Sequence, residues 1–244
     1  MKNLKIFTVL TMLVMLFPLA ACNKPSPASP AKITQPQLPQ VQACIVDTWA
    51  CLGTNCMPSS KIAIAYIVDG NGAAVTNAAV TLSWDTWTLE LPCIGTGSSS
   101  GINQPGMTAT SIDGGVYRYV ALDSSISGKS CTLSVATGGS TYTTTFTCID
   151  GSPSIVSGAS GVTCSWNPGV GNFNTIAYND NGATTNSRIG PPIPSNPYIL
   201  SSGVFTFPGN GNSSVGLYLW QEDGFSGLGS NSFILTNKTF VQYY

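Results

Sequence analysis

The sequence contains no histidine, and only 8% of its 244 residues are charged. The lack of histidine excludes Ser-His-Asp and Cys-His catalysis and removes the commonest side-chain metal ligand. Nine basic residues against ten acidic ones give a net charge of −1, which excludes the basic surface of a nucleic-acid-binding protein. We therefore expect no enzyme, no metal site, no cofactor and no nucleic-acid partner. A hydrolase built on paired carboxylates, such as Glu222 with Asp223, is the least favoured alternative.

Residues 1–21 predict a signal peptide. Lys2 and Lys5 precede an apolar run that is too short for a stable transmembrane helix. The run ends in Leu19-Ala20-Ala21-Cys22, which resembles the lipobox of bacterial lipoproteins. The resemblance implies that Cys22 carries the acyl chains, palmitate among them, and anchors the protein in a membrane. Because Asn23 follows where an aspartate signals retention, the resemblance favours the outer membrane. The alternative is an ordinary signal peptide whose cleavage site adjoins a cysteine.

Residues 22–43 are expected to form the acylated terminus and an extended stalk. Five prolines in this segment fix the backbone torsion φ and remove backbone donors, which favours polyproline II over helix. Residues 44–60 hold three cysteines at spacings that match no common zinc site, and we interpret them as a cysteine-rich cap pinned by disulfides. A metal or redox site is the alternative there.

The remaining chain predicts an all-β protein. From residue 61 onward the apolar residues recur with a period of two, and no ten-residue stretch has the pattern of a helix. Residues 61–149 are expected to form a β-sandwich, with a turn at 69–72 and another at 113–115 that separates strands at 107–112 and 116–122. Residues 150–244 are expected to form a second β-rich module, with strands at 161–166, 175–178, 198–200, 204–207, 214–221 and 232–243.

The segment 63–82 carries a family resemblance. It reads Ala63-Ile-Ala-Tyr-Ile-Val-Asp-Gly-Asn-Gly-Ala-Ala-Val-Thr-Asn-Ala-Ala-Val-Thr-Leu82, and Asp113-Gly-Gly-Val-Tyr117 follows. This pattern resembles the bacterial Ig-like domains of the invasin and intimin kind over about residues 60–149. The resemblance implies a seven-strand sandwich that serves as a spacer or adhesive module, and it implies no catalytic site.

Cysteines other than Cys22 are expected to form disulfides, because an exported chain meets oxidising conditions. Seven is an odd number, so one thiol stays free or pairs between chains. If Gly139-Ser140 is the turn of a hairpin, Cys131 faces Cys148 directly and a bond can form there. The alternative is that each cysteine pairs with a neighbouring segment. The remaining candidates are Cys44, Cys51, Cys56, Cys93 and Cys164.

Aromatic residues supply the candidate ligand site. Trp84 and Trp87 are three residues apart, which places their rings on opposite faces of a strand, and Tyr218 and Trp220 lie on one face of another. Flat rings beside Asn, Ser and Asp side chains suit sugar binding, whereas core packing is the commoner role of tryptophan. We therefore expect a lipid-anchored envelope protein that acts as a surface binding, adhesion or scaffolding module, with a protein or glycan ligand. A carbohydrate-binding lipoprotein is the alternative.

Overall fold

The structure is a computed structural model that describes residues 37–52, 55–102, 107–122, 126–150, 153–167, 173–179, 187–189, 193, 195–201 and 213–244. The described residues form β-strands and one short 3₁₀ helix, Ser99–Gly101, which confirms the all-β expectation. The predicted signal peptide, Cys22, residues 23–36 of the stalk and the predicted strand at 204–207 lie outside the described residues.

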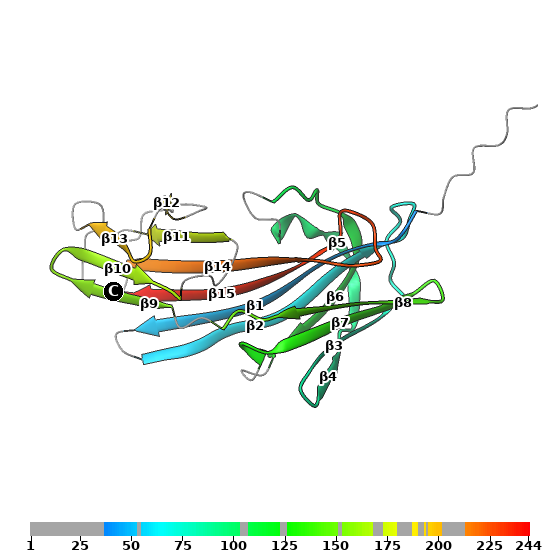
Figure 1. Cartoon of the computed structure of the whole chain (residues 1–244), viewed down its shortest axis with the longest axis horizontal. Coiled ribbons are helices and arrows are strands. Elements are labelled where there is room, and N and C mark those ends of the chain that lie inside the picture. The colour runs from blue at the N-terminus through cyan, green and yellow to red at the C-terminus, as the bar shows by residue number, and fades with distance from the viewer. Residues whose placement is uncertain are drawn as a thin grey trace, which may run out of the picture. The chain divides into compact units, whose positions relative to one another are not determined.

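The largest sheet contains eight strands in the order β12-β11-β14-β15-β1-β2-β6-β5. Its central strands are long, and they run side by side in Figure 1. The strands are β1 (Gln40–Leu52), β2 (Asn55–Val68), β5 (Cys93–Ser98), β6 (Asp113–Val120), β11 (Phe173–Asn179), β12 (Ser187–Ile189), β14 (Ser214–Gly224) and β15 (Phe233–Tyr243).

Strand β1, the first strand of the described chain, lies between β2 and the last strand. It pairs antiparallel with β2 and parallel with the last strand, β15. It begins at Gln40, inside the range expected for the stalk, because Val41, Ala43 and Ile45 are buried in the core. The described residues of 44–60, expected as a separate cap, belong instead to β1 and β2.

A four-stranded sheet covers the large sheet near the start of β1. Its strands are β3 (Ala79–Trp84), β4 (Trp87–Glu90), β7 (Ser130–Thr137) and β8 (Ser140–Thr147), in the order β4-β3-β7-β8. The main core lies between the two sheets and includes Ile45, Ala65 and Ile67 from the large sheet and Leu82 and Leu133 from the small one. The alternation of buried residues along β2 and β3 is that of strands with one face in a core.

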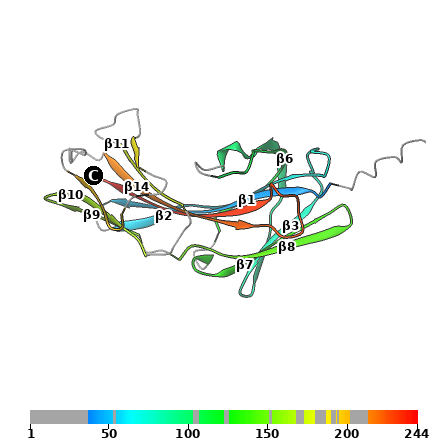
Figure 2. The same cartoon turned by 45° about the horizontal axis from the view of Figure 1, so that its top comes forward.

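A three-stranded sheet covers the same face of the large sheet near the end of β15. Its strands are β9 (Ser154–Gly158), β10 (Gly161–Ser165) and β13 (Tyr198–Ser201), in the order β13-β10-β9. Val162 and Leu200 pack there against Val215, Leu217 and Leu219 of β14 in a second core. Figure 1 and Figure 2 show the two small sheets at opposite ends of the long strands. The expected strands at 161–166, 175–178, 198–200, 214–221 and 232–243 are confirmed to within a few residues, and the one at 204–207 stays a prediction.

The turn expected at Asp113-Gly114-Gly115 is not present. These residues lie inside β6, and the expected strand at 107–112 is irregular. A Cβ atom at Gly115 would lie 1.7 Å from the backbone oxygen of Val75, and one at Gly114 would lie 2.7 Å from that of Ile67. These glycines therefore allow another backbone segment to approach the strand closely, and they do not form a turn.

The expected register of the β7–β8 hairpin was also wrong. Thr137 faces Ser140, so the turn residues are Gly138 and Gly139, both with positive φ, and not Gly139-Ser140. Cys131 consequently faces Phe146. The predicted neighbour Cys148 lies two residues farther along, just beyond the end of β8.

Candidate functional site

The exposed apolar side chains at the end of β1 form the candidate site. Leu52 faces Tyr243 across β1 and β15, and Met57 of β2 faces Ala50, two residues before Leu52. Residues opposite one another, and alternate residues along a strand, share a face of the sheet. Leu52, Met57 and Tyr243 are 67%, 69% and 42% exposed. We name these three residues, together with the half-buried Tyr218 and Val241 on the same face, the outer patch.

Tyr218 belongs to the outer patch because its ring lies over a glycine. A Cβ atom at Gly216 would lie 2.8 Å from Cε2 of the Tyr218 ring. Gly216 faces Val241, and Val241 faces Ala50, so the ring extends along the sheet toward the end of β1. The absence of a side chain at Gly216 thus leaves room for a broad aromatic surface beside Val241.

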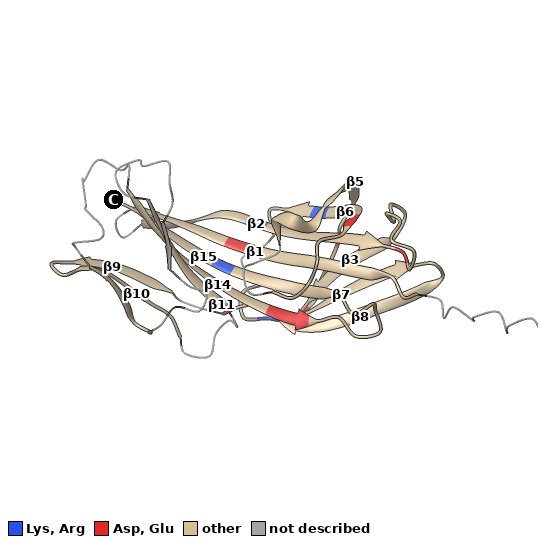
Figure 3. Ribbon diagram, turned by 90° about the horizontal axis from the view of Figure 1, so that it is seen from above, with Lys and Arg blue, Asp and Glu red and all other residues tan. Residues whose placement is uncertain are grey.

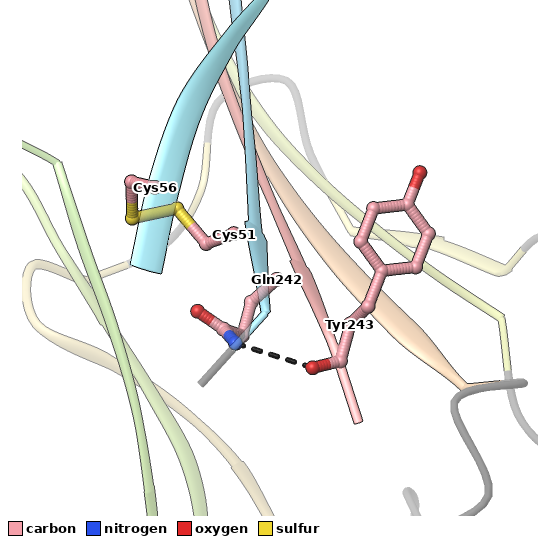
Figure 4. The surroundings of a disulfide bond; sticks show 4 residues. All are labelled: Cys51, Cys56, Gln242 and Tyr243. Carbon is pink, nitrogen blue, oxygen red and sulfur yellow. Dashed lines mark hydrogen bonds between the residues drawn. A yellow bond between two sulfur atoms is a disulfide. The ribbon is translucent and has the colours of Figure 1, made fainter. Parts of the chain in front are cut away.

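A disulfide closes the hairpin that carries the outer patch. Cys51 faces Cys56 across β1 and β2, and the two sulfur atoms are bonded at 2.06 Å. Figure 4 shows Gln242 beside this bond and the ring of Tyr243 turned away from it, as alternation along β15 requires. The Gln242 side-chain amide donates a hydrogen bond to the backbone oxygen of Tyr243. The disulfide therefore fixes the strand ends from the face opposite the outer patch.

An open cavity of about 480 Å³ lies at the same end of the sheet. It is bounded by the last residues of β1 and β15 and by the middle of β9, where Val156 is 58% exposed. The lining residues are Leu52, Ile155, Val156, Ser157, Gln242, Tyr243 and Tyr244. None of these side chains is charged at neutral pH, and burial raises the pKa of the Tyr244 phenol to about 12.

Three buried charged residues lie under the centre of the large sheet, between the two cores. Asp47 of β1 faces Lys61 of β2 and Lys238 of β15, at 3.7 Å and 2.9 Å from carboxylate oxygen to ammonium nitrogen. Both ammonium groups also approach the ring of Trp49, which stacks on Phe240. Figure 3 shows the acidic segment of β1 beside the basic segment of β15. All three charged residues are at most 7% exposed.

The same cluster contains a serine–lysine contact. The Lys238 ammonium donates a hydrogen bond to the Ser127 hydroxyl at 2.8 Å. A serine nucleophile needs a partner that accepts its proton, whereas an ammonium held by a carboxylate is itself a donor. The contact with Asp47 therefore assigns Lys238 a role in the buried ion pair.

The tryptophans and tyrosines predicted as ligand residues occupy different environments. Trp84 and Trp87 face each other across the β3–β4 turn, with Trp84 buried in the main core and Trp87 54% exposed. Trp220 packs partly against the third cluster of buried residues, on the face of the large sheet opposite the main core. Only Tyr218 belongs to the outer patch. The sequence did not predict the other members of the outer patch, such as Leu52, Met57 and Val241. Single apolar residues near strand ends form no pattern that distinguishes them from other apolar residues.

The other five cysteines that the structure describes are unbonded, although each was expected as a disulfide candidate. Cys44 and Cys164 are buried, which raises the pKa of each thiol to about 12. Cys93 is exposed. The sulfur atoms of Cys131 and Cys148 lie 3.5 Å apart in contact but without a covalent bond.

Within the described ranges there is no cluster of three or more Cys, Asp or Glu side chains placed to hold a metal ion. No helix of sufficient length and hydrophobicity to cross a membrane occurs in that part of the chain. Comparisons with protein-family models, curated proteins and solved structures found no significant match to this chain.

Proposed function

We propose that this protein is a lipid-anchored component of the bacterial cell envelope, and that its outer patch binds a protein partner. In this proposal residues 1–21 are removed, Cys22 carries the acyl chains, and residues 61–149 serve as an Ig-like spacer. The protein acts by binding and adhesion, with no catalytic step. The observation that carries the proposal is the outer patch, since exposed apolar side chains that lie together on a sheet mark interaction surfaces.

The position of the outer patch on β1 supports this arrangement. The folded chain starts at Gln40, and the outer patch lies at the other end of the same 13-residue strand. Thirteen extended residues span about 40 Å, so the patch is far from the point where the stalk joins the fold. A surface at that distance from the anchored end is placed to meet another molecule.

The chemistry of the outer patch favours a protein partner. Residues 48–60, which include the end of β1 and the start of β2, contain no charged side chain, and neither do residues 239–243 of β15. A surface of this kind gains free energy by burying apolar area, at roughly 25 cal/mol per Å². Tyr218 and Tyr243 add aromatic rings, which are enriched at protein interfaces.

The test is site-specific photo-cross-linking in cells that express the full chain. A photoreactive amino acid at Leu52 or Tyr243 is expected to give one adduct with a defined protein, and the same label at Val120 is expected to give none. Val120 is the matched control, since it is 56% exposed but lies on β6. The variant Leu52→Asp should abolish co-purification of that same protein, and Val120→Asp should not.

The anchor is tested separately by metabolic labelling with palmitate. The wild-type chain is expected to incorporate the label and to fractionate with the outer membrane, and Cys22→Ser is expected to do neither. Absence of label in the wild type contradicts the anchored part of the proposal. Equal cross-linking from Leu52 and Val120 contradicts the binding part.

A further inference from the structure

A second pocket lies on the same face of the large sheet, near the start of β1. Its volume is about 310 Å³, within the range of small-ligand sites. Residues from the loop before β6, the end of β14 and the β14–β15 turn bound it. They are Thr108, Ala109, Thr110, Glu222, Ser230, Asn231, Ser232 and Phe233.

A network of hydrogen bonds holds the walls of this pocket in place. The Asn231 side chain accepts from the backbone N–H of Thr110 at 2.9 Å and donates to the backbone oxygen of Thr110 at 2.8 Å. Gln42, which is fully buried, donates from its amide to the backbone oxygens of Thr110 and Asn231. Its amide oxygen accepts from the Ser99 hydroxyl at 2.5 Å. The loop and the turn are therefore fixed to β1 before any ligand arrives, which lowers the entropy lost on binding.

The pocket combines one carboxylate with hydroxyl groups and an adjacent aromatic ring. Glu222 is the one charged residue among the described lining residues, and Thr108, Thr110 and Ser230 carry hydroxyl groups. Trp220 precedes Glu222 by two residues on β14, so both side chains leave the same face of the strand about 7 Å apart. Ala109 of the pocket wall and Trp220 pack against the same buried cluster. Trp220 is not among the described lining residues, and its side chain lies one strand repeat beyond Glu222 on the same face.

We infer that this pocket binds a neutral, polyhydroxylated ligand of the sugar class. A carboxylate oxygen accepts hydrogen bonds from sugar hydroxyl groups, and threonine and serine hydroxyl groups both donate and accept them. An indole ring offers an apolar face with a polar edge for the C–H face of a sugar ring. The described lining residues include no lysine or arginine, so an anionic ligand lacks a counter-charge there. This inference concerns a different site from the outer patch and goes beyond the proposed function.

The test uses the mature chain with Cys22→Ser and nuclear magnetic resonance. Glucose, galactose, mannose and N-acetylglucosamine are titrated in turn, with methylammonium as a cationic probe. At least one sugar is expected to shift the Trp220 indole N–H and the amides of Ser230 and Asn231 in a saturable way. The Trp87 indole N–H should stay unchanged, since that exposed ring lies on β4.

Two isosteric variants complete the test. Glu222→Gln is expected to weaken sugar binding at least fivefold, whereas Asp223→Asn, at the next residue and outside the lining, is expected to leave it unchanged. Thermal unfolding of both variants at a temperature no lower than that of the wild type shows that the fold is intact. The inference is overturned if none of the four sugars shifts these signals, if only methylammonium does, or if both variants bind as the wild type does. None of these outcomes affects the cross-linking at Leu52.

Discussion

The carboxylate of Asp47 lies 2.9 Å from the Lys238 ammonium and 3.7 Å from the Lys61 ammonium, and all three side chains are buried. The three residues are direct neighbours across β2, β1 and β15, so one carboxylate serves two cations. The cluster separates the two apolar cores on one face of the large sheet. Removing the Asp47 carboxylate leaves the two buried ammonium groups without a negatively charged partner.

We therefore expect Asp47→Asn to lower the free energy of unfolding by about 3–5 kcal/mol, the range for breaking a buried ion pair. The measurement is urea unfolding of the purified protein. Asp85→Asn is the matched control, because Asp85 forms an ion pair of 2.9 Å with Lys129 at the surface. Asparagine also tolerates the positive φ of that position. That change should stay below about 1 kcal/mol, and equal effects of the two variants contradict the assignment.

The contact between Cys131 and Cys148 predicts that the two thiols form a disulfide under oxidising conditions. Their sulfur atoms are 3.5 Å apart and are shielded from solvent. A hydrogen bond from the Cys148 thiol lowers the pKa of Cys131 and raises that of Cys148. Because a thiolate is the attacking species, this pair should oxidise before Cys44 and Cys164, whose pKa values burial raises to about 12.

Peptide mapping without reduction checks this order of oxidation. We expect a linked peptide that contains Cys131 and Cys148 once a mild oxidant is added, while Cys44 and Cys164 remain as thiols. Cys148→Ser should abolish that peptide without creating a new link to Cys131. A link from Cys131 to any other cysteine in the wild-type protein disagrees with the geometry.

Most strands of the second half were predictable because their alternation is strong and local. Val215, Leu217 and Leu219 share one face of β14, as expected, with Tyr218 and Trp220 on the other. Strand β1 was not predictable, because residues on both of its faces are buried and its sequence therefore does not alternate between apolar and polar. The polar residues Gln42 and Asp47 are among the buried ones. Its parallel partner β15 lies about 190 residues away, so no local turn signals the pair.

The candidate site was predictable only in part for a related reason. Aromatic residues are visible in a sequence, and Tyr218 indeed reaches the outer patch. The expectation that Trp84 and Trp87 lie on opposite faces of one strand was wrong, because they face each other on the neighbouring strands β3 and β4. Trp84 on the inner strand is buried, whereas Trp87 on the edge strand is exposed. Asn231 and Thr110 meet across more than 100 residues, so the walls of the polar pocket could not be foreseen from spacing.

The close approach at Gly115 predicts a strong effect of a single methyl group. A Cβ atom there would overlap the backbone oxygen of Val75, so Gly115→Ala should lower the free energy of unfolding by about 3 kcal/mol or more. Gly101→Ala is the control, since nothing lies within 4 Å of its Cβ position. Denaturant unfolding measures both. A loss at Gly115 no larger than at Gly101 rejects the close packing of these segments.

The disulfide between Cys51 and Cys56 should stabilise the end of β1 modestly. The bond closes a loop with a sequence separation of five, for which the chain-entropy model gives about 2 kcal/mol. We expect Cys51→Ala with Cys56→Ala to lower the free energy of unfolding by that amount and to increase hydrogen exchange at Leu52 and Tyr243. Exchange in β7, which belongs to the four-stranded sheet and not to the sheet that carries the bond, serves as the internal reference. A uniform rise across both regions contradicts a local effect.

Glu222 and Asp223 predict a pH dependence of stability with a definite sign. Partial burial raises the pKa of both carboxyls, and the nearby Asp223 raises that of Glu222 further. A carboxyl whose pKa is higher in the folded state favours folding below its unfolded pKa, and that contribution is lost as the pH rises through the folded pKa. Glu222→Gln removes the charged form, so we expect the variant to unfold at a higher temperature than the wild type at pH 7. The difference should disappear near pH 3, where both carboxyls are protonated. Thermal unfolding at the two pH values measures it, and a variant that is less stable at pH 7 than at pH 3, relative to the wild type, shows that the Glu222 carboxylate is stabilising.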